Sequence, residues 1–301
     1  MDLIKKRILI TGSNGKIGYR LVKKFSENAQ YEIHAAGIEE KSVCGNVEYT
    51  QLDISKKNQV KALFHKFFPD LVINAAGYTN VDLCETNKEL SWNINVKGTE
   101  NIAMSSWAID AHMIHISSDY VFDGKEGPYA EDDVPHPISY YGRTKLAGEN
   151  TLRSSGARYT VVRSNVLYGA VSGERPDFVR WVIESLKENK QIKIVTDQIN
   201  NPTYIGDLVD AIEKIGILEL PGIYNIGGAE LLSRYEFCLR IAEYFKLGKE
   251  LILPVTSKEL NQPALRPLRS GLINRKAESD LHYSPKPIET TFQMIKEELG
   301  I

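Results

Sequence analysis

The stretch Arg7–Gly18, which reads RILITGSNGKIG, decides the fold. It opens with a short apolar run that is typical of a buried strand. Gly12, Gly15 and Gly18 follow directly, and the apolar pattern of Lys16–Phe25 then predicts a helix. Glycines at this spacing permit a tight turn and a close approach of the backbone to a phosphate, while the helix start contributes N–H groups. The stretch therefore predicts a strand–turn–helix unit that binds a dinucleotide.

The same stretch disfavours a magnesium-dependent P-loop, because Gly15-Lys16 is followed by Ile17 and not by Ser or Thr. In dinucleotide-binding folds, an acid about 20 residues farther on binds the adenosine 2′-hydroxyl. Here Ala36–Lys41 (AGIEEK) has no carboxylate at the expected position, and no arginine clearly replaces it. The sequence therefore leaves the choice between NAD and NADP open. Lys16 could meet a 2′-phosphate, although an exposed helix lysine is the simpler interpretation.

Short apolar runs and longer helical patterns alternate through the first half of the chain. Strands are predicted at residues 7–11, 31–36, 47–52, 71–74, 113–117 and 159–163, and helices at 16–25, 58–68, 87–110 and 139–155. This alternation, with near-continuous apolar strands, predicts a parallel sheet that helices cover on both faces. The expected fold class is α/β, with a doubly wound parallel sheet of the Rossmann type.

The pattern changes after Ser164, where helices dominate. They are predicted at residues 177–189, 205–218, 234–245 and 288–299, with one strand-like piece at 223–226. We expect residues 1–163 to form a dinucleotide-binding domain, rejoined by part of 195–226. Residues 164–301 would form most of a smaller, mainly helical substrate-binding lobe near the carboxyl edge of the sheet.

Composition argues against several functional classes. The 301 residues carry 37 basic and 39 acidic side chains, so a net charge of −2 predicts neither nucleic-acid nor membrane-surface binding. Three cysteines without a Cys-x-x-Cys pattern predict neither disulfides nor a zinc ribbon. His112 and His115 lack a third ligand at metal-binding spacing, so no metal site is expected. Without a signal peptide or a run of about 18 apolar residues, we expect a cytoplasmic protein.

Tyr141 and Lys145 point to chemistry, because residues four apart share one face of a helix. The lysine charge lowers the tyrosine pKa from about 10, so the phenol can exchange a proton with a carbonyl oxygen. The pattern alone is weak evidence, since Tyr19 and Lys23 repeat it in what we interpret as a surface pair. The context of the first pair differs, because Ser117–Ser118 ends a predicted strand and places hydroxyls at the carboxyl edge of the sheet.

Together these motifs resemble the extended short-chain dehydrogenase/reductase superfamily, and within it the dTDP-4-dehydrorhamnose reductase family. The resemblance runs almost end to end. Besides the glycine loop, it rests on Asp53, Asn74–Asp82 (NAAGYTNVD), Asn93–Thr99 (NINVKGT), Ser117–Gly124 (SSDYVFDG), Tyr141–Glu149 (YGRTKLAGE), Asp197–Thr203 (DQINNPT) and Arg266–Ser270 (RPLRS).

The resemblance implies three sets of site residues. The catalytic set is Ser118, Tyr141 and Lys145. The set for an NADP or NAD cofactor is Gly12, Asn14, Gly15, Lys16, Ile17, Gly18, Asp53, Ile54, Ala75, Ala76, Thr79, Tyr141 and Lys145. The set near a nucleotide-sugar substrate is Thr79, Val81, Asp119, Val121 and Arg266. A helix cap for Asp53 and a solvated loop charge for Arg266 stay open as alternative roles.

The implied activity is NAD(P)H-dependent reduction of the C4 keto group of a nucleotide-linked 6-deoxy sugar, namely dTDP-4-dehydro-L-rhamnose to dTDP-L-rhamnose. Homodimers are common in the family, so a homodimer is one assembly open to this chain. One departure leaves the substrate open, because Val166 stands where these reductases typically carry tryptophan.

Two other functions are compatible with the resemblance. A sugar-nucleotide epimerase or dehydratase would use the same scaffold, although Asp119 lacks the adjacent glutamate that dehydratases generally add. A non-catalytic NADP-binding protein is the other alternative, because Ser117–Glu149 resembles the regulatory subunit of methionine adenosyltransferase.

Overall fold

The computed structural model of the protein describes residues 5–169 and 176–301. These residues form two compact units, and the chain passes between the units five times. The first unit holds the described residues up to Ser118 together with Tyr140–Arg163 and Val209–Tyr224. The second holds Asp119–Ser139, the described part of Ser164–Leu208, and Asn225–Ile301. Neither unit is therefore one continuous stretch of sequence.

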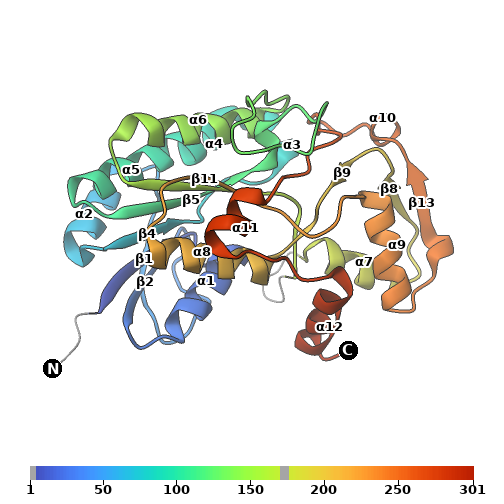
Figure 1. Cartoon of the computed structure of the whole chain (residues 1–301), viewed down its shortest axis with the longest axis horizontal. Helices are drawn as coiled ribbons and strands as arrows, with labels where there is room; N and C mark the ends of the chain where they lie inside the picture. The colour runs from blue at the N-terminus through green and yellow to red at the C-terminus, as the bar shows by residue number, and fades with distance from the viewer. Residues whose placement is uncertain (1–4, 170–175) are drawn as a thin grey trace. The chain divides into compact units, whose positions relative to one another are not determined.

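The first unit is built on a seven-stranded sheet with the order β11-β6-β5-β4-β1-β2-β3 (Figure 1). Its strands are β1 (Lys6–Thr11), β2 (Tyr31–Gly37), β3 (Glu48–Gln51), β4 (Leu71–Asn74), β5 (His112–Ser118), β6 (Tyr159–Ser164) and β11 (Gly222–Ile226). The pairings β1–β2, β1–β4, β2–β3 and β4–β5 are parallel. Strands are added outward from β1 in both directions, which confirms the expected doubly wound, Rossmann-type fold.

Helices cover both faces of this sheet (Figure 1). One face carries α2 (Lys57–Phe67), α5 (Thr99–Ala108) and α6 (Tyr140–Ser155), and the other carries α1 (Lys16–Ser26) and α8 (Ile205–Leu218). Leu9, Val72 and Met113 belong to the core cluster beneath the first three helices. Their neighbours Ile8 and Ile73 are also fully buried. Because successive strand residues point to opposite faces, a strand covered on both sides must be apolar throughout.

The span 87–110, predicted as one helix, is instead a helix interrupted by a wider turn. It contains α4 (Lys88–Trp92), a π-helix at Asn93–Gly98, and α5. The buried Asn95 side chain accepts a hydrogen bond from the amide of Tyr78 (2.7 Å) and donates to the Thr144 hydroxyl (2.9 Å). Irregular helical turns of this kind recur at functional sites. Here the turn carries the amide that joins the loop after β4 to α6.

The second unit combines helices with short strand pairs. Its helices are α7 (Phe178–Lys187), α9 (Arg234–Tyr244), α10 (Ser257–Leu260), α11 (Arg275–Leu281) and α12 (Ile288–Leu299). Its strand pairs are β7 (Leu167–Tyr168) with β10 (Thr203–Tyr204), β8 (Ile192–Val195) with β13 (Ile252–Val255), and β9 (Ile199–Asn200) with β12 (Leu232–Ser233).

Aromatic packing forms part of the core of the second unit. The Phe237 ring centroid lies 5.1 Å from that of Tyr168 and 5.9 Å from those of Phe178 and Phe292. The buried side chain of Asn201 donates to the carbonyl oxygens of Gly228 and Leu272. Buried polar groups of this kind are stable only when they are hydrogen-bonded, so Asn201 holds two loops in place.

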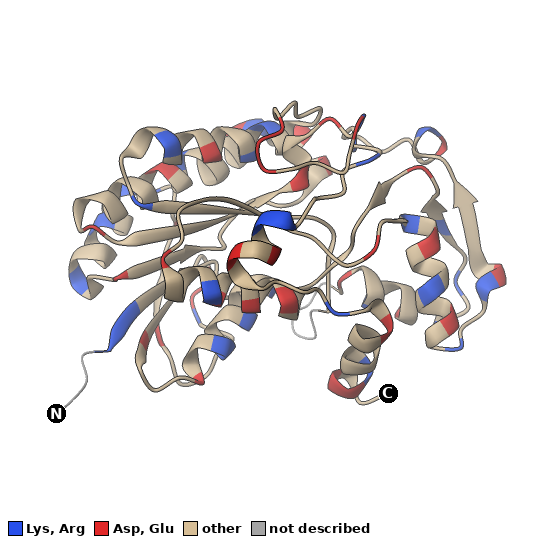
Figure 2. Ribbon diagram, viewed as in Figure 1, with Lys and Arg blue, Asp and Glu red and all other residues tan. Residues whose placement is uncertain are grey.

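The described residues show no segregation of charge along the ribbons, no membrane-spanning helix and no metal-binding cluster. Basic and acidic side chains are interspersed along the ribbons of both units (Figure 2). Among the residues that the structure describes, no helix is both long and apolar enough to cross a bilayer, and no group of three or more His, Cys, Asp and Glu could hold a metal ion.

Candidate active site

Two of the three glycines in the loop between β1 and α1 are required by steric constraints. Gly12 has a φ of +66°, and a Cβ there would lie 2.6 Å from the amide nitrogen of Ala76. A Cβ on Gly18 would lie 2.1 Å from the carbonyl oxygen of Gly12. Gly15 caps α1 without a side-chain hydrogen bond, and the first turn of α1 has no acidic residue. The helix start is therefore suited to an external anion such as a pyrophosphate.

Two polar residues of this loop, Asn14 and Ser13, differ in their hydrogen bonding. Asn14 donates to the Glu39 carboxylate (3.1 Å) and the carbonyl oxygen of Lys41 (2.8 Å), and accepts from the amide of Val43 (3.1 Å). It therefore joins the glycine loop to the loop after β2, and its expected pyrophosphate contact stays a prediction. The Ser13 hydroxyl is buried and has no partner among the described residues. An unpaired buried hydroxyl is costly, so it fits a loop completed by a ligand.

A polar ladder runs from the carboxyl ends of β1 and β4 to the middle of the neighbouring strand β5. The register aligns Thr11, Asn74 and His115, and the Thr11 hydroxyl donates to Asn74 (2.8 Å). The Asn74 amide lies 3.1 Å from Nδ1 of His115. Burial, and to a smaller extent the charge of Lys145, hold the pKa of His115 well below its ordinary value. This histidine is therefore neutral, and the ladder fixes the strand ends from which Ala75 and Ala76 follow.

The expected catalytic residues lie on two elements of the first unit. Ser118 is the last residue of β5, while Tyr141 and Lys145 lie four residues apart near the start of α6. All three are buried. Nζ of Lys145 donates to the carbonyl oxygen of Ile116 at 2.6 Å, two residues before Ser118. This bond ties the Tyr141/Lys145 face of α6 to the carboxyl end of β5.

A buried ion pair supports the same junction. The Glu149 carboxylate accepts the Ser117 hydroxyl at 2.6 Å and two Arg163 hydrogen bonds at 3.0 and 2.7 Å. The side chains of Glu149 and Arg163 are completely inaccessible to solvent. The three residues come from β5, α6 and β6, so one network holds the helix against two strands. Burial lowers the pKa of Lys145 to about 8, and the nearby Glu149 partly opposes that shift.

The structure also places four further predicted residues of the first unit, Asp53, Ile54, Thr79 and Val81. One carboxylate oxygen of Asp53 accepts from the amide and hydroxyl of Ser55 in a local turn before α2. The N-cap of α2 is Lys56, without a side-chain hydrogen bond, so Asp53 does not cap this helix. Ile54 is buried, and a Cβ on Gly98 would touch it at 2.6 Å. The exposed Thr79 precedes α3 (Val81–Thr86), whose first residue is half-buried. Their contacts with a cofactor or substrate stay predictions.

Comparison with known proteins gives the family. Residues 6–300 match the family model described as the RmlD substrate binding domain. The chain is 30% identical to dTDP-4-dehydrorhamnose reductase of Aggregatibacter actinomycetemcomitans, over 96% of this chain and 98% of that protein. The chain belongs to the dTDP-4-dehydrorhamnose reductase family. The family and the oxidoreductase class expected from the sequence are thereby confirmed.

Two further relatives of this dTDP-4-dehydrorhamnose reductase family member bear on its function. The crystal structure of a dTDP-4-dehydrorhamnose reductase from Bacillus anthracis, in complex with NADP, superposes with a TM-score of 0.87 at 31% identity. The alignment covers 98% of this chain and 99% of that chain. Methionine adenosyltransferase 2 subunit beta of Xenopus laevis is 32% identical, over 84% of this chain and 76% of that protein. The NADP of the first relative agrees with the expected cofactor type.

In the second unit of this reductase-family chain, three predicted substrate residues differ in accessibility. Asp119 is buried and accepts the Ser270 hydroxyl at 2.6 Å, and Val121 is fully buried in the core. Arg266 is half-exposed and donates to the carbonyl oxygen of Ala264 at 2.7 Å. Because Val121 has no accessible surface, a substrate contact by its side chain would require rearrangement. That contact stays a prediction.

Sequence reasoning in this family member missed two residues that interact electrostatically with predicted site residues, Arg234 and Glu149. Arg234 lies over the Phe178 ring at 5.1 Å, where burial lowers its guanidinium pKa and electrostatic interaction with Tyr120 and Asp119 opposes that shift. No motif marked it, since it lies at the start of a helix in a polar sequence. Glu149 had a signal, because it lies four residues after Lys145 on the same helix face.

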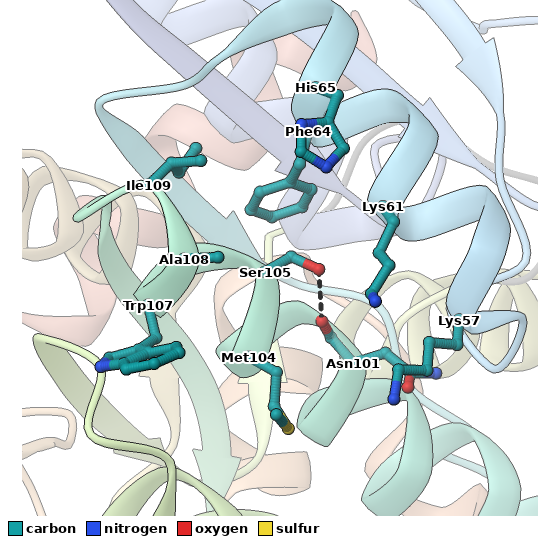
Figure 3. A pocket seen from close by; sticks show the side chains of 10 residues that line it. All are labelled: Lys57, Lys61, Phe64, His65, Asn101, Met104, Ser105, Trp107, Ala108 and Ile109. Carbon is teal, nitrogen blue, oxygen red and sulfur yellow. Dashed lines mark hydrogen bonds between the residues drawn. The ribbon is translucent and has the colours of Figure 1, made fainter.

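The hollow between α2 and α5 is separate from the candidate site. It measures about 230 Å³ and is lined by Lys57, Lys61, Phe64, His65, Asn101, Met104, Ser105, Trp107, Ala108 and Ile109 (Figure 3). The one hydrogen bond drawn there runs from the Ser105 hydroxyl to the carbonyl oxygen of Asn101. None of the predicted catalytic, cofactor or substrate residues lines this hollow.

Proposed function

We propose that this protein reduces the C4 keto group of a nucleotide-linked 6-deoxy sugar. The reaction would convert dTDP-4-dehydro-L-rhamnose to dTDP-L-rhamnose, with NADPH or NADH as hydride donor. One observation carries the proposal, the 2.6 Å bond from Lys145 to the carbonyl oxygen of Ile116, which sets the Tyr141 face of α6 at the end of β5. Membership of the reductase family supports the reaction type.

The mechanism assigns one role to each of three side chains. The Ser118 hydroxyl donates a hydrogen bond to the keto oxygen and holds the carbonyl in place. The Tyr141 hydroxyl gives its proton to that oxygen, which becomes the C4 hydroxyl. The positive charge of Lys145 stabilises the tyrosinate left behind. The reduced nicotinamide, when bound, supplies hydride to the carbonyl carbon. General acid catalysis of this kind typically contributes about 10²–10⁴-fold, and orientation contributes further.

We assign dinucleotide binding to the first unit and most of the nucleotide-sugar binding to the second. Gly12, Gly15 and Gly18 would carry the pyrophosphate at the start of α1. In the second unit, Arg266 and the newly found Arg234 suit the diphosphate of the sugar nucleotide, because guanidinium groups bind such anions with paired donors. Val166 stands where these reductases typically carry tryptophan, so other keto-sugars of this class belong in the turnover test as well.

The test is a turnover assay with dTDP-4-dehydro-L-rhamnose generated in the reaction. We expect nicotinamide absorbance to fall with NADPH or NADH in proportion to the keto-sugar consumed. Cofactor binding without a fall in this absorbance would contradict our assignment of dTDP-4-dehydro-L-rhamnose as the substrate. Conversion of a sugar nucleotide to an isomer, without net oxidation of the cofactor, would instead indicate an epimerase.

A second function is favoured by one observation, the 32% identity to methionine adenosyltransferase 2 subunit beta. In that case the chain would bind a dinucleotide and a synthetase without turning over a sugar. Co-purification with a methionine adenosyltransferase, together with no keto-sugar turnover, would support this function. The reductase relative is aligned over nearly its whole length, which is why we place reduction first.

A further inference from the structure

We propose that Glu39 selects the cofactor, and that this protein uses NADH in preference to NADPH. The inference rests on the dinucleotide binding of the proposed function. It would distinguish this chain from the Bacillus anthracis relative, which was solved in complex with NADP.

The Glu39 carboxylate lies above the carboxyl end of β2. The strand ends at Gly37, and Oε2 of Glu39 lies 2.9 Å from the position that a Cβ on Gly37 would occupy. Although Glu39 follows the strand by two residues, its side chain folds back over the strand end. Glu39 is 21 residues after Gly18 and lies beyond the strand-end position at which the sequence pattern shows no carboxylate. In dinucleotide-binding folds, an acid about 20 residues beyond the glycine loop binds the adenosine ribose 2′-hydroxyl.

Hydrogen bonds from both neighbouring elements hold Glu39 in this position. Nδ2 of Asn14 donates to Oε2 at 3.1 Å. The Tyr49 hydroxyl donates to the Glu39 carbonyl oxygen at 2.6 Å. Asn14 is itself fixed by the backbone of Lys41 and Val43. Glu39 is exposed, as Glu40 is, but the hydrogen bonds from Asn14 and Tyr49 favour one position for its backbone and carboxylate.

The chemistry of this carboxylate favours a free ribose. An ionised carboxylate only accepts hydrogen bonds, and the 2′- and 3′-hydroxyls of NADH are donors. The 2′-phosphate of NADPH presents oxygen acceptors and a negative charge, which the carboxylate repels. The positive charges of Lys16, the first residue of α1, and of Lys41, in the loop after β2, act in the opposite direction. The geometry favours Glu39, because its carboxylate is the group held over the strand end.

The experiment measures binding of NADH and NADPH separately, without any sugar, by the change in nicotinamide fluorescence. We expect the intact protein to bind NADH at least about tenfold more tightly than NADPH. Glu39→Gln should bring the two dissociation constants closer together, because it should weaken the binding of NADH and strengthen the binding of NADPH. Glu40→Gln removes the same charge from the next, exposed residue and should leave the ratio within about twofold.

Three other outcomes of these binding measurements would overturn the proposal. Equal or tighter binding of NADPH by the intact protein would overturn the proposal. Equal shifts in Glu39→Gln and Glu40→Gln would also overturn it, because the effect would then be one of general charge. Binding of neither dinucleotide would overturn it together with the proposed function. Because no sugar is present, a failure of keto-sugar turnover leaves the result of this experiment intact.

Discussion

Nζ of Lys145 lies 2.6 Å from the carbonyl oxygen of Ile116, so a side chain of α6 is bonded to the backbone of β5 beside Ser118. This ammonium group is buried, and burial lowers its pKa to about 8. The carboxylate of Glu149, one turn farther along α6, opposes the shift. Lys145 is therefore a cation whose charge is lost within the range of ordinary pH measurements.

The first prediction concerns this ionisation. Lys145 is protonated below pH 8 and neutral above it, so its support for tyrosinate is lost as pH rises. We expect kcat/KM for the cofactor, which reports ionisations of the free enzyme, to fall about tenfold per pH unit above that value. Lys145→Arg keeps the charge at all these pH values and should remove the fall, even if the activity is lower. A profile that stays flat in the intact protein to pH 10 or so would contradict the assignment.

The second prediction separates the two Tyr-x-x-x-Lys pairs. Tyr141→Phe removes the proton donor and little volume, so turnover should drop by about 10²–10⁴-fold while cofactor affinity stays near that of the intact protein. Tyr19→Phe makes the same change on α1 and should leave turnover within about twofold. Steady-state kinetics and dinucleotide titration of both variants provide the measurement. Unchanged turnover in Tyr141→Phe would exclude the mechanism.

The third prediction concerns the buried pair Glu149–Arg163. Glu149→Gln leaves the guanidinium charge of Arg163 buried without its counter-ion, so the free energy of unfolding should fall by about 3–5 kcal/mol. Glu219, which pairs with Lys6 and Arg158 at the surface, offers the matched control. Glu219→Gln should cost about 1 kcal/mol or less, because exposed ion pairs are screened by water.

Urea unfolding of the two variants tests this difference. Similar losses of stability would show that burial does not govern the strength of the Glu149–Arg163 pair. Glu149→Gln should also lower the pKa of Lys145 further, since the carboxylate holds that pKa up. The alkaline fall in kcat/KM would then begin at lower pH, an effect that simple destabilisation would not produce.

The fourth prediction is a loss of stability in acid that depends on His112. Its Nε2 bonds the Thr160 hydroxyl at 2.8 Å, and that hydroxyl donates to the carbonyl oxygen of Leu220. Nδ1 of His112 is buried and has no hydrogen-bond partner among the residues that the structure describes, and burial lowers the pKa of His112 to about 4. Between pH 6.5 and 4, His112 is protonated in the unfolded chain but stays neutral in the folded protein. The free energy of unfolding therefore decreases as the pH is lowered through this range.

This one residue should contribute up to about 1.4 kcal/mol per pH unit within that window. The measurement is the free energy of unfolding as a function of pH for the intact protein and for His112→Gln. The variant should show a shallower slope, with part of the slope retained by the buried His115. Identical slopes would mean that His112 is protonated in the folded protein as easily as in the unfolded chain.

Much of the first unit could be predicted, because a strand buried on both faces leaves an apolar run that the sequence displays directly. The glycine loop was equally visible, since its backbone conformation admits no side chain at Gly12 or Gly18. The π-helix at Asn93–Gly98 was not predicted. Over six residues, its wider period cannot be separated from that of an α-helix by hydrophobic pattern alone.

Other features depend on contacts that no local pattern records. Glu149 and Arg163 meet across a helix and a strand, and the sequence offers no sign that the two charges share one buried site. Glu39 was passed over because it follows the end of β2 by two residues, and only the folded loop shows that its side chain turns back. Residues 119–139 cluster with the second unit although the sequence placed them before the boundary at residue 163.

The repeated passage of the chain between the two units has a consequence for biosynthesis. The sheet of the first unit is completed by β11, so its edge is missing until residue 226 of 301 has left the ribosome. A fragment that stops at residue 163 would leave β6 as an exposed edge strand, which favours aggregation. The nascent chain therefore cannot complete its first unit early and add the second afterwards. Expression of the dinucleotide-binding part alone would require circular permutation or a fused α8–β11 segment.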